Sequence, residues 1–391
     1  DVIRRQRQMC IRDRDNASTT QKPQQVLDAI QSMYSKTNAN VHRALYDIGS
    51  EATEKFENSR KKVSNFIHSE SESEIIFTGG TTESLNLLAH SLGNKLGPED
   101  DILVSEMEHH ANLVPWQMAC GRTGANLKFI PMNENGDLDL TSLETTFTDS
   151  TKIISITHVS NVLGTINPIS EIAKIAKEIG AVFIVDGAQG VPHQSVDVKK
   201  LGCDFYVFSG HKMLAPTGVG VLWGKMEKLE HMDPFMGGGE MIETVTMESA
   251  TWNQVPYKFE AGTPNFVQAV GLGAAIDYLN DLGMDKVFEH EKKLTKYALE
   301  KMSHIEKVNI FGSPKSRTGV ISFNVDGIHA QDLAQFLNED NIAIRVGHHC
   351  AQPLLSRLDE NSVDRLSLYI YNDKKDIDLF CNSLANIKQY F

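Results

Sequence analysis

Long apolar segments are missing from this sequence. No apolar run reaches roughly 18 residues, and the first residues lack the apolar core of a secretory signal. We therefore expect neither a membrane-spanning segment nor a membrane partner. Cysteine is scarce as well, because the chain has only five, scattered along its length and odd in number. Such cysteines are typical of free thiols in a reducing compartment, so we expect a cytoplasmic protein.

Basic residues are fewer than acidic residues in this sequence. The chain has 38 Lys and Arg against 51 Asp and Glu, which gives a formal net charge of −13. Binding to nucleic acid depends on basic side chains, so we expect no nucleic-acid partner. With 391 residues, 41% of them hydrophobic, the chain can bury the core of a large α/β domain and a smaller second one without disulfides. We expect an acidic enzyme.

Residues 1–14 differ from the rest, because they are rich in arginine and show little periodicity. We expect a non-native or disordered leader that stands outside the fold. The alternative is a basic targeting arm. The remaining sequence is expected to form a large domain at residues 15–275 and a small C-terminal domain at residues 276–391.

Two short apolar runs near the middle of the chain each end in a polar group. Residues 182–185 are β-branched or aromatic and read as a buried parallel strand that ends at Asp186. Residues 205–208 form a second run that stops just before Lys212. Two strands joined by a crossover place Asp186 and Lys212 at one edge of a sheet, where α/β sheets bind ligands. The alternative is that both are ordinary surface charges.

An amine and a carboxylate at one edge suit pyridoxal 5'-phosphate (PLP). The lysine holds the cofactor as a Schiff base, and the acid keeps the pyridine nitrogen protonated so that the ring accepts electrons. Gln189 and His211 lie in the same two loops as hydrogen-bonding side chains, and Ser209 is placed to donate to a phosphate. We expect Asp186, Gln189, Ser209, His211 and Lys212 to contact the cofactor.

A phosphate cradle is predicted after the strand at residues 74–78. Gly79 and Gly80 follow this strand, and Thr81 and Thr82 open a helical pattern. Free N–H groups and the helix dipole favour an anion at such a helix start. The same residue types also form the N-terminal caps of ordinary helices, and this is the alternative interpretation.

Two more predicted strands end in polar groups. Residues 102–105 precede a stretch with two adjacent histidines, His109 and His110. Adjacent side chains point in different directions and no second ligand cluster lies nearby, so we expect no metal site. Residues 152–157 precede Asn161, which is either a turn residue or a further group at the ligand edge.

One cysteine stands out near the C-terminus. Cys350 follows Arg345, Gly347 and two histidines, and Pro353 comes soon after, which indicates a loop. A thiol is nucleophilic as thiolate, and the neighbouring imidazoles and arginine favour that form. The alternative is an inert buried thiol. Further on, Arg365 precedes an apolar run, and its guanidinium can hold a substrate α-carboxylate through two parallel hydrogen bonds.

These motifs resemble a known family. Asp-Gly-Ala-Gln at 186–189 and Ser-Gly-His-Lys at 209–212 resemble the PLP-lysine region of class V aminotransferases. Arg-Val-Gly-His-His-Cys-Ala-Gln-Pro at 345–353, with Arg-Leu-Ser-Leu at 365–368, resembles the SUF-type (group II) cysteine desulfurases and selenocysteine lyases. The resemblance covers residues 15–391. Departures such as Ser18, Gly79, Leu366 and Asp373 remove no group that the chemistry needs.

The resemblance implies the PLP-dependent transferase fold of type I: a large domain with a mostly parallel seven-stranded sheet flanked by helices, and a smaller α+β domain. It implies conversion of L-cysteine to L-alanine with a persulfide on Cys350, which supplies sulfur for iron–sulfur cluster assembly. L-selenocysteine is a further substrate that the resemblance allows. The alternatives are another class V reaction, transamination or kynureninase-like cleavage, and a PLP-binding scaffold without turnover.

The resemblance also assigns roles to individual residues. His109 is expected to stack on the cofactor ring and to move protons, with Lys212 as base and Cys350 as nucleophile. Thr263, in the segment Glu-Ala-Gly-Thr-Pro-Asn at 260–265, is expected to bind the phosphate of the other subunit in a homodimer. A small sulfur-acceptor protein of the SUF system is expected to dock near the cysteine loop. The substrate is assigned to Arg365, Asn161 and Arg43, and the cofactor to Thr81, Thr82, His109, Asn161, Asp186, Gln189, Ser209, His211, Lys212 and Thr263.

Overall fold

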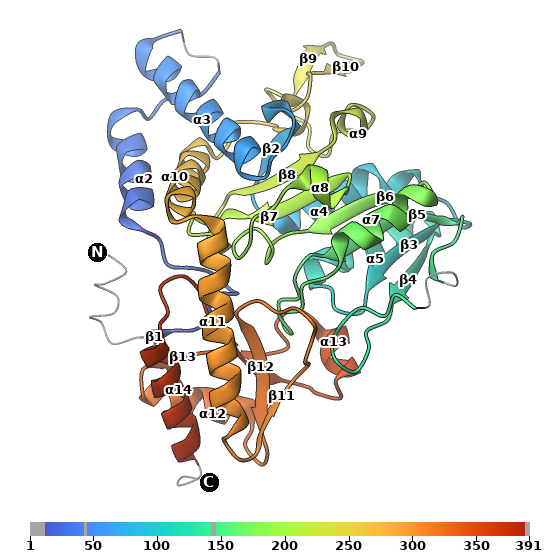
Figure 1. Ribbon diagram of the computed structural model, residues 1–391. Coiled ribbons are helices and arrows are strands. Elements are labelled where there is room, and N and C mark those ends of the chain that lie inside the picture. The colour runs from blue at the N-terminus through green and yellow to red at the C-terminus, as the bar shows by residue number, and fades with distance from the viewer. Residues whose placement is uncertain (1–11, 43–44, 142–145, 388–391) are drawn as a thin grey trace.

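A computed structural model describes residues 12–42, 45–141 and 146–387 of the chain. It has two parts, a large domain around one broad sheet and a small domain below it in the view of Figure 1. The long helix α11 (Met284–Ser303) descends from the large part into the small one. It follows α10 (Phe266–Leu282) after Gly283, whose φ of 82° lies in the left-handed region that favours glycine and ends the first helix.

The large domain is built on a seven-stranded sheet. Strand β8 (Gly220–Gly224) runs antiparallel to both of its neighbours, and all other neighbouring strands pair in parallel. This confirms the prediction of a mostly parallel sheet. In spatial order the strands are β2 (Ile75–Thr78), β8 (Gly220–Gly224), β7 (Phe205–Ser209), β6 (Val182–Asp186), β5 (Thr151–Thr157), β3 (Asp101–Ser105) and β4 (Asn126–Ile130).

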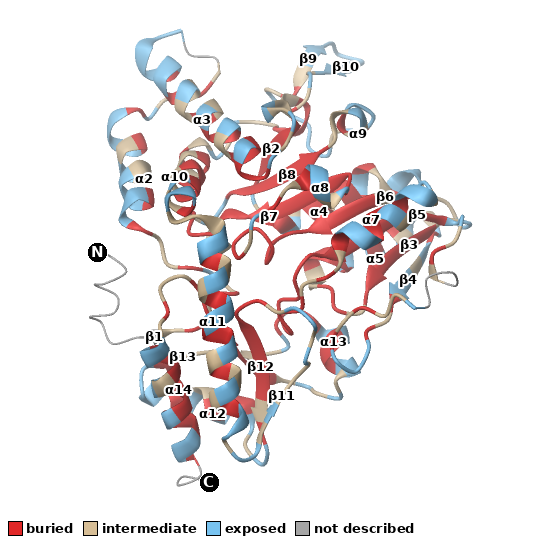
Figure 2. Cartoon of the chain, viewed as in Figure 1, coloured by how far each residue is buried: buried red, intermediate tan, exposed pale blue. Residues whose placement is uncertain are grey.

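Helices cover both faces of this sheet, so alternate residues of one strand enter different cores. Val185 packs into a core with α2, α3, α7 and α10, whereas Ile184 packs into a core with α4 and α5. This double burial explains the continuous apolar runs of the central strands, and Figure 2 shows these strands buried along most of their length. The other helices of this domain are α2 (Gln24–Lys36), α3 (Asp47–Phe66), α4 (Thr81–Ser91), α5 (Val114–Thr123), α7 (Ile169–Glu178), α8 (Val198–Leu201) and α9 (Met226–Glu230).

The small domain packs helices on one face of a four-stranded antiparallel sheet. Phe323, Leu366 and Phe380 belong to its core, which is separate from the cores of the large domain. The sheet order is β11 (Val308–Ile310), β12 (Val320–Val325), β15 (Val363–Ser367) and β14 (Arg345–Gly347). The remaining elements are α12 (Ala330–Glu339), β13 (Ile342–Ala343), α13 (Gln352–Arg357) and α14 (Lys374–Asn386), and the hairpin β9 (Ile242–Val245) and β10 (Ala250–Trp252) projects from the large domain.

The end of the arginine-rich segment is part of the fold, which corrects the expectation that all of residues 1–14 stand outside it. Strand β1 (Arg12–Asp13) pairs in parallel with β13. The side chain of Arg14 is 0% exposed and donates a 2.6 Å hydrogen bond to the backbone oxygen of Asp376. Burying a guanidinium costs free energy unless it is paired, and Asp376 supplies that pairing. Residues 1–11 lie outside the described part of the chain.

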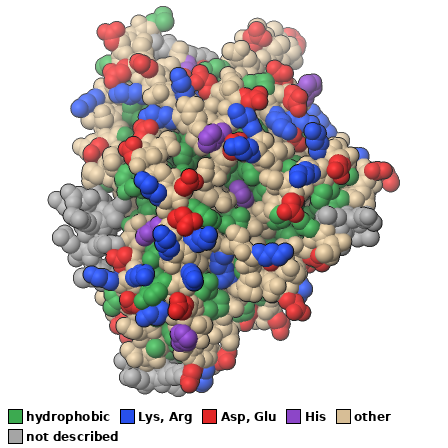
Figure 3. Space-filling view, in the orientation of Figure 1, with side chains coloured by type: hydrophobic (Ala, Val, Ile, Leu, Met, Phe, Trp, Pro, Cys, Tyr) green, Lys and Arg blue, Asp and Glu red, His purple; other side chains and the backbone are tan. Residues whose placement is uncertain are grey.

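The surface carries charges of both signs. Figure 3 shows acidic and basic side chains interspersed over the face in view. Among the described residues, none of the helices combines the length and the apolar character that crossing a bilayer requires.

Candidate active site

The predicted residues gather at the carboxyl ends of the central strands. A cavity of about 220 Å³ opens there, between the two domains. Asn161 follows β5, Asp186 ends β6 and Lys212 follows β7, as the crossover topology predicts. The expected cofactor and substrate residues that line this cavity are Thr81, Thr82, His109, Asn161, Asp186, Gln189, Ser209, His211, Lys212 and Arg365, together with Cys350.

Asp186 and Lys212 are both buried at the cavity. Burial raises the pKa of Asp186, and the N–H of Ala188, 2.9 Å from Oδ1, and the Lys212 charge act against this shift. Burial likewise lowers the pKa of Lys212, against the attraction of Asp186. A lysine with a lowered pKa is more often the free amine, which is the form that attacks an aldehyde. The pair therefore has the properties that a Schiff-base lysine and its acid partner need.

The residues of the predicted phosphate cradle lie together at the start of α4. The hydroxyl of Ser209 accepts a hydrogen bond from the backbone N–H of Thr81 at 2.8 Å and lies 2.7 Å from Thr81 Oγ1. Gly80 has a φ of 154°, and a Cβ on Gly220 of β8 would lie 2.4 Å from Gly80 Cα. Only glycine at both positions allows this close approach, which leaves hydroxyls and free N–H groups for an anion.

His109 enters the cavity as a neutral imidazole. Burial, together with the charges of Lys212, His110 and Arg365, lowers the pKa of His109 to about 3. Its Nδ1 accepts the N–H of Ala111 at 3.0 Å, so the ring proton is on Nε2. A flat, uncharged ring in this position fits the face of a pyridine.

Glu108 is a residue that the sequence reasoning missed. Its carboxylate is buried behind the His109 loop, where burial raises the pKa of Glu108 to about 7. It accepts hydrogen bonds from Ser105 at 2.5 Å, Asn112 at 2.6 Å and the N–H of Thr157 at 3.0 Å. Glu108 thus ties the loop after β3 to β5, and its spacing of three and four residues from Ser105 and Asn112 was the available signal.

Arg365 is held in place by three hydrogen-bond acceptors. Its side chain donates to the Asn161 carbonyl at 2.9 Å and to Ser18 Oγ and Asp15 Oδ1, both at 2.9 Å. Its Nε is buried and has no hydrogen-bond partner among the described residues. A carboxylate in the cavity is the natural partner for such a donor.

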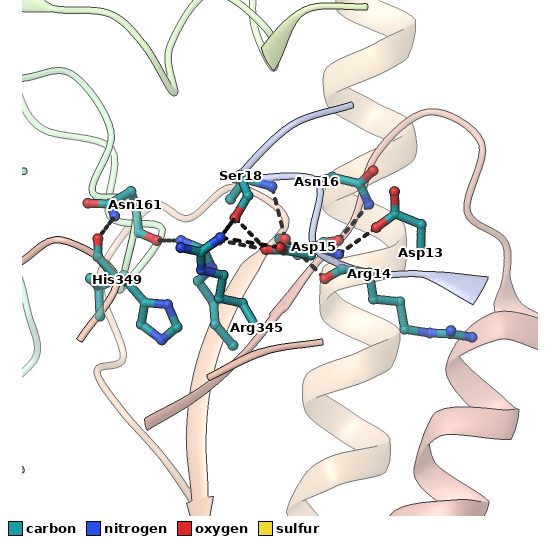
Figure 4. A network of polar contacts seen from close by, with 12 residues as sticks. Asp13, Arg14, Asp15, Asn16, Ser18, Asn161, Arg345 and His349 are labelled. Atoms are coloured by element: carbon teal, nitrogen blue, oxygen red, sulfur yellow. Dashed lines mark hydrogen bonds and ion pairs between the residues drawn. The ribbon is translucent and has the colours of Figure 1, made fainter. Parts of the chain in front are cut away.

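Arg345 joins this network from the neighbouring strand, and Figure 4 shows it close to Ser18 and Asp15. Its guanidinium donates to Ser18 Oγ at 3.1 Å and lies 3.8 Å from Asp15 Oδ2. The site list expected from the sequence lacked Arg345, Ser18 and Asp15. The arginine in the motif before Cys350 was the available signal for the first.

Cys350 lies in a short loop between β14 and α13, and it lines the same cavity as Lys212. His349 and Cys350 have φ values of 50° and 56°, a left-handed conformation that is unfavourable for residues with a side chain. Hydrogen bonds hold the loop in this form. The Cys350 carbonyl accepts from the N–H of His110 at 2.7 Å, and the His349 carbonyl accepts from Asn161 Nδ2 at 2.8 Å.

Thr263 is not among the described residues that line the cavity. It lies in a separate recess with Glu260 and Asn265, so its expected role toward another subunit stays a prediction. Arg43 lies outside the described residues. Within the described part of the chain, no three His, Cys, Asp or Glu side chains are grouped as a metal site would require.

The side chains at the cavity fit PLP. A buried amine is present for the aldehyde, a buried carboxylate for the pyridine nitrogen, a neutral imidazole for the ring face and a hydroxyl-lined helix start for the phosphate.

Comparison with known proteins agrees with this site. The family model described as "Aminotransferase class-V" matches residues 14–380. A protein of Halalkalibacterium halodurans named "Probable cysteine desulfurase" is 48% identical over 96% of this chain and 93% of its own, and a protein of Staphylococcus aureus with the same name is 50% identical over 96% and 92%.

Solved structures agree as well. An apo cysteine desulfurase from Thermococcus onnurineus NA1 superposes with a TM-score of 0.94 at 39% identity, covering 97% of this chain and 95% of that one. The cysteine desulfurase CsdA from Escherichia coli gives 0.93 at 36% identity, with 98% and 96% covered. On these grounds the chain belongs to the class V aminotransferase family.

Proposed function

We propose that this chain is a PLP-dependent cysteine desulfurase. It converts L-cysteine to L-alanine and leaves the sulfur as a persulfide on Cys350. The observation that carries this proposal is the position of Cys350, which lines one cavity with Lys212 although 137 residues of sequence lie between them. The names of relatives about 50% identical over nearly the whole chain support the same activity.

PLP bound at this site supplies a ring that withdraws electrons from the bonds around the amino-acid Cα. Asp186 keeps the pyridine nitrogen protonated, and the free amine of Lys212 removes the Cα proton. Arg365 binds the α-carboxylate of the substrate through its guanidinium, whose buried Nε–H has no partner among the described residues, and fixes the amino acid in one orientation. His109 offers a neutral ring face and an Nε2 proton beside the reacting groups.

Cys350 then attacks the sulfur of the substrate as a thiolate. A sulfur–sulfur bond forms and the carbon–sulfur bond breaks, and its electron pair stays with the carbon fragment, which is protonated at Cβ. The sum is L-cysteine plus the Cys350 thiol giving L-alanine plus the Cys350 persulfide, with no external oxidant or reductant. L-selenocysteine enters the same path, since selenium leaves carbon more readily than sulfur.

The test is incubation with L-cysteine followed by mass measurement of the peptide that contains Cys350. We expect this peptide to gain the mass of one sulfur atom, while peptides with Cys120 or Cys381 stay unchanged. Cys350→Ala should keep the yellow colour of bound PLP and release no alanine beyond background. Lys212→Ala should lose the colour that depends on the Schiff base. Alanine release at the wild-type rate by Cys350→Ala would show that Cys350 is not the nucleophile.

We also propose that the chain acts as a homodimer. Leu45 and Met247 are apolar residues with 104% and 98% relative exposure, and Tyr46, Ile48 and Val245 near them in sequence are exposed as well. Apolar groups of this kind mark protein interfaces. Sedimentation at several concentrations tests this, and a monomer at all of them would contradict it.

The persulfide needs an acceptor, which we propose to be a small protein of the SUF system that docks at the Cys350 loop. The sulfur then serves iron–sulfur cluster assembly, in the cytoplasm. Cys350 is partly exposed at the edge of the cavity, which allows such transfer. Transfer of labelled sulfur from the loaded enzyme to the purified acceptor tests this step.

A further inference from the structure

A chain of polar contacts runs from the cavity into the small domain. Gln189 lines the cavity, and its Nε2 donates to the backbone oxygen of Ala17 at 2.7 Å. Its Oε1 lies 3.2 Å from Nε2 of His193. On the other side of the imidazole, Nδ1 lies 3.1 Å from Oε1 and 2.8 Å from Oε2 of Glu291, which belongs to α11.

The three side chains that make these polar contacts are all buried. Gln189, His193 and Glu291 are each 2% exposed. Tyr369 of the small domain meets the His193 ring edge-on at 5.3 Å, and its hydroxyl donates to the Pro192 carbonyl at 3.0 Å. The imidazole therefore has one packed position, and its two nitrogens face two different partners.

The hydrogen-bond roles fix where the protons are. An amide oxygen only accepts, so the contact between Gln189 Oε1 and His193 Nε2 requires a proton on Nε2. The contact between Nδ1 and Glu291 contains one further proton, on the nitrogen or on the carboxyl group. In both cases the pair has no net charge, which suits its burial, and the ring donates to Gln189.

The orientation of Gln189 follows from these roles. The Ala17 carbonyl accepts a hydrogen bond from the NH₂ group of Gln189, and His193 donates one to the Gln189 oxygen. The amide therefore cannot flip without losing two hydrogen bonds. The second N–H of the amide is left for a ligand in the cavity that Gln189 lines.

We propose that His193 is a positioning residue for the cofactor: Glu291 of the small domain orients its imidazole, and the imidazole locks the Gln189 amide so that its second N–H stays available to bound PLP. This role rests on the cofactor site proposed above. It makes the small domain a contributor to the electronic state of the cofactor, through a residue that touches neither cofactor nor substrate.

The test is a double-mutant cycle read from the visible absorption band of Lys212-bound PLP and from the PLP dissociation constant. His193→Phe keeps an aromatic ring against Tyr369 but removes both nitrogens. We expect it to shift the band and to weaken PLP binding roughly threefold to tenfold, about the worth of one hydrogen bond. Gln189→Leu should do the same, and the double variant should be no worse than Gln189→Leu alone.

Glu291 supplies the matched pair of variants. Glu291→Gln can donate an amide proton to Nδ1 and so keeps the Nε2 proton in place, and it should retain the wild-type band. Glu291→Leu leaves the ring free to change tautomer and should resemble His193→Phe. If circular dichroism shows that His193→Phe fails to fold, the comparison of Glu291→Gln with Glu291→Leu is sufficient to test the proposal.

If the contact between His193 and Glu291 only holds the two domains together, the variants give different results. In that case His193→Phe and Glu291→Leu lower the melting temperature while the band and the PLP dissociation constant stay at wild-type values, and this result overturns the proposal. Additive effects in the double variant overturn it too. A wild-type protein that forms no Lys212-bound band contradicts the cofactor site itself, which separates that failure from failure of the positioning role.

Discussion

Arg345 and Arg365 lie directly opposite each other on the antiparallel strands β14 and β15. Two like charges in this register repel, which is unfavourable unless other groups offset it. Ser18 accepts a hydrogen bond from each guanidinium, and Asp15 supplies one carboxylate for the two cations. One positive charge remains in excess, and under the proposed function the α-carboxylate of L-cysteine would neutralise it.

Replacement of Arg365 by Lys should weaken binding of cysteine. A lysine keeps the charge but loses the planar set of donors, so the carboxylate loses a hydrogen bond to a charged group worth about 1.5–3 kcal/mol. We expect KM for L-cysteine to rise about tenfold to a hundredfold, with a smaller change in kcat. Alanine formation measures this. Arg357→Lys is the matched control, because Arg357 is a half-exposed arginine of α13 outside the cavity, and it should leave KM unchanged.

Replacement of Gly220 by Ala should weaken PLP binding. The added Cβ meets the Gly80 backbone at 2.4 Å, so the helix start that is predicted to bind the phosphate must shift. We expect the PLP dissociation constant to rise at least about tenfold, as measured by equilibrium dialysis. Gly237→Ala is the control, because a Cβ there has no neighbour within 4 Å. Equal PLP affinity of both variants would contradict the cradle.

His109 should stay neutral across the working pH range. The folded pKa of about 3 lies below the ordinary value of 6.5, so the folded state binds fewer protons than the unfolded state between these values. The stability that His109 contributes is therefore complete above about pH 6.5 and is lost as the pH falls toward 3. The Cε1–H resonance of His109 should not move between about pH 8 and about pH 5. A midpoint near 6.5 in an NMR titration would contradict this.

Asp364 should make the fold less stable as the pH rises. It is 0% exposed on β15, and neither carboxylate oxygen has a hydrogen-bond partner among the described residues. Burial raises the pKa of Asp364 from 3.8 to about 8, so the folded state holds a proton that the unfolded state releases, and stability falls between these two values as the pH increases.

Two variants of Asp364 separate charge from polarity. Asp364→Asn removes the ionisation, so the melting temperature should lose this part of its pH dependence while the unpaired polar group remains. Asp364→Val also removes the polar group, so its free energy of unfolding should exceed that of Asp364→Asn by about 1–3 kcal/mol. Urea unfolding at two pH values measures both effects, and a less stable Asp364→Val would mean that the carboxyl group has an important partner.

The sequence alone was sufficient to predict which polar residues lie at the carboxyl ends of the strands. Buried parallel strands are continuous apolar runs, so residues 182–185 and 205–208 marked β6 and β7, and the structure extends each by a single residue. Asp186 and Lys212 follow from these ends and from the crossover rule. Thr81 and Thr82 could be placed for the same reason, because glycines between a strand and a helix are a local signal.

Contacts between distant segments could not be read from local patterns. Asp15 meets Arg365 across 350 residues, and Arg14 meets the Asp376 backbone across 362 residues. A lone charged residue in a polar segment gives no periodicity, so the burial of Arg14 had no sequence signal. The tie between His193 and Glu291 is of the same kind, since it joins two domains whose relative placement depends on all of their packing.

Cys350 is anchored on both sides within a very short loop. The N–H of His110 holds its carbonyl at 2.7 Å, the next residues start α13, and the N–H of Gln352 donates to His110 Nε2 at 3.1 Å. Under the proposed function, a persulfide on this thiol would therefore have little reach. We expect the acceptor protein to bring its own nucleophile to the entrance of the cavity, so that the shape of the acceptor decides which molecules receive sulfur.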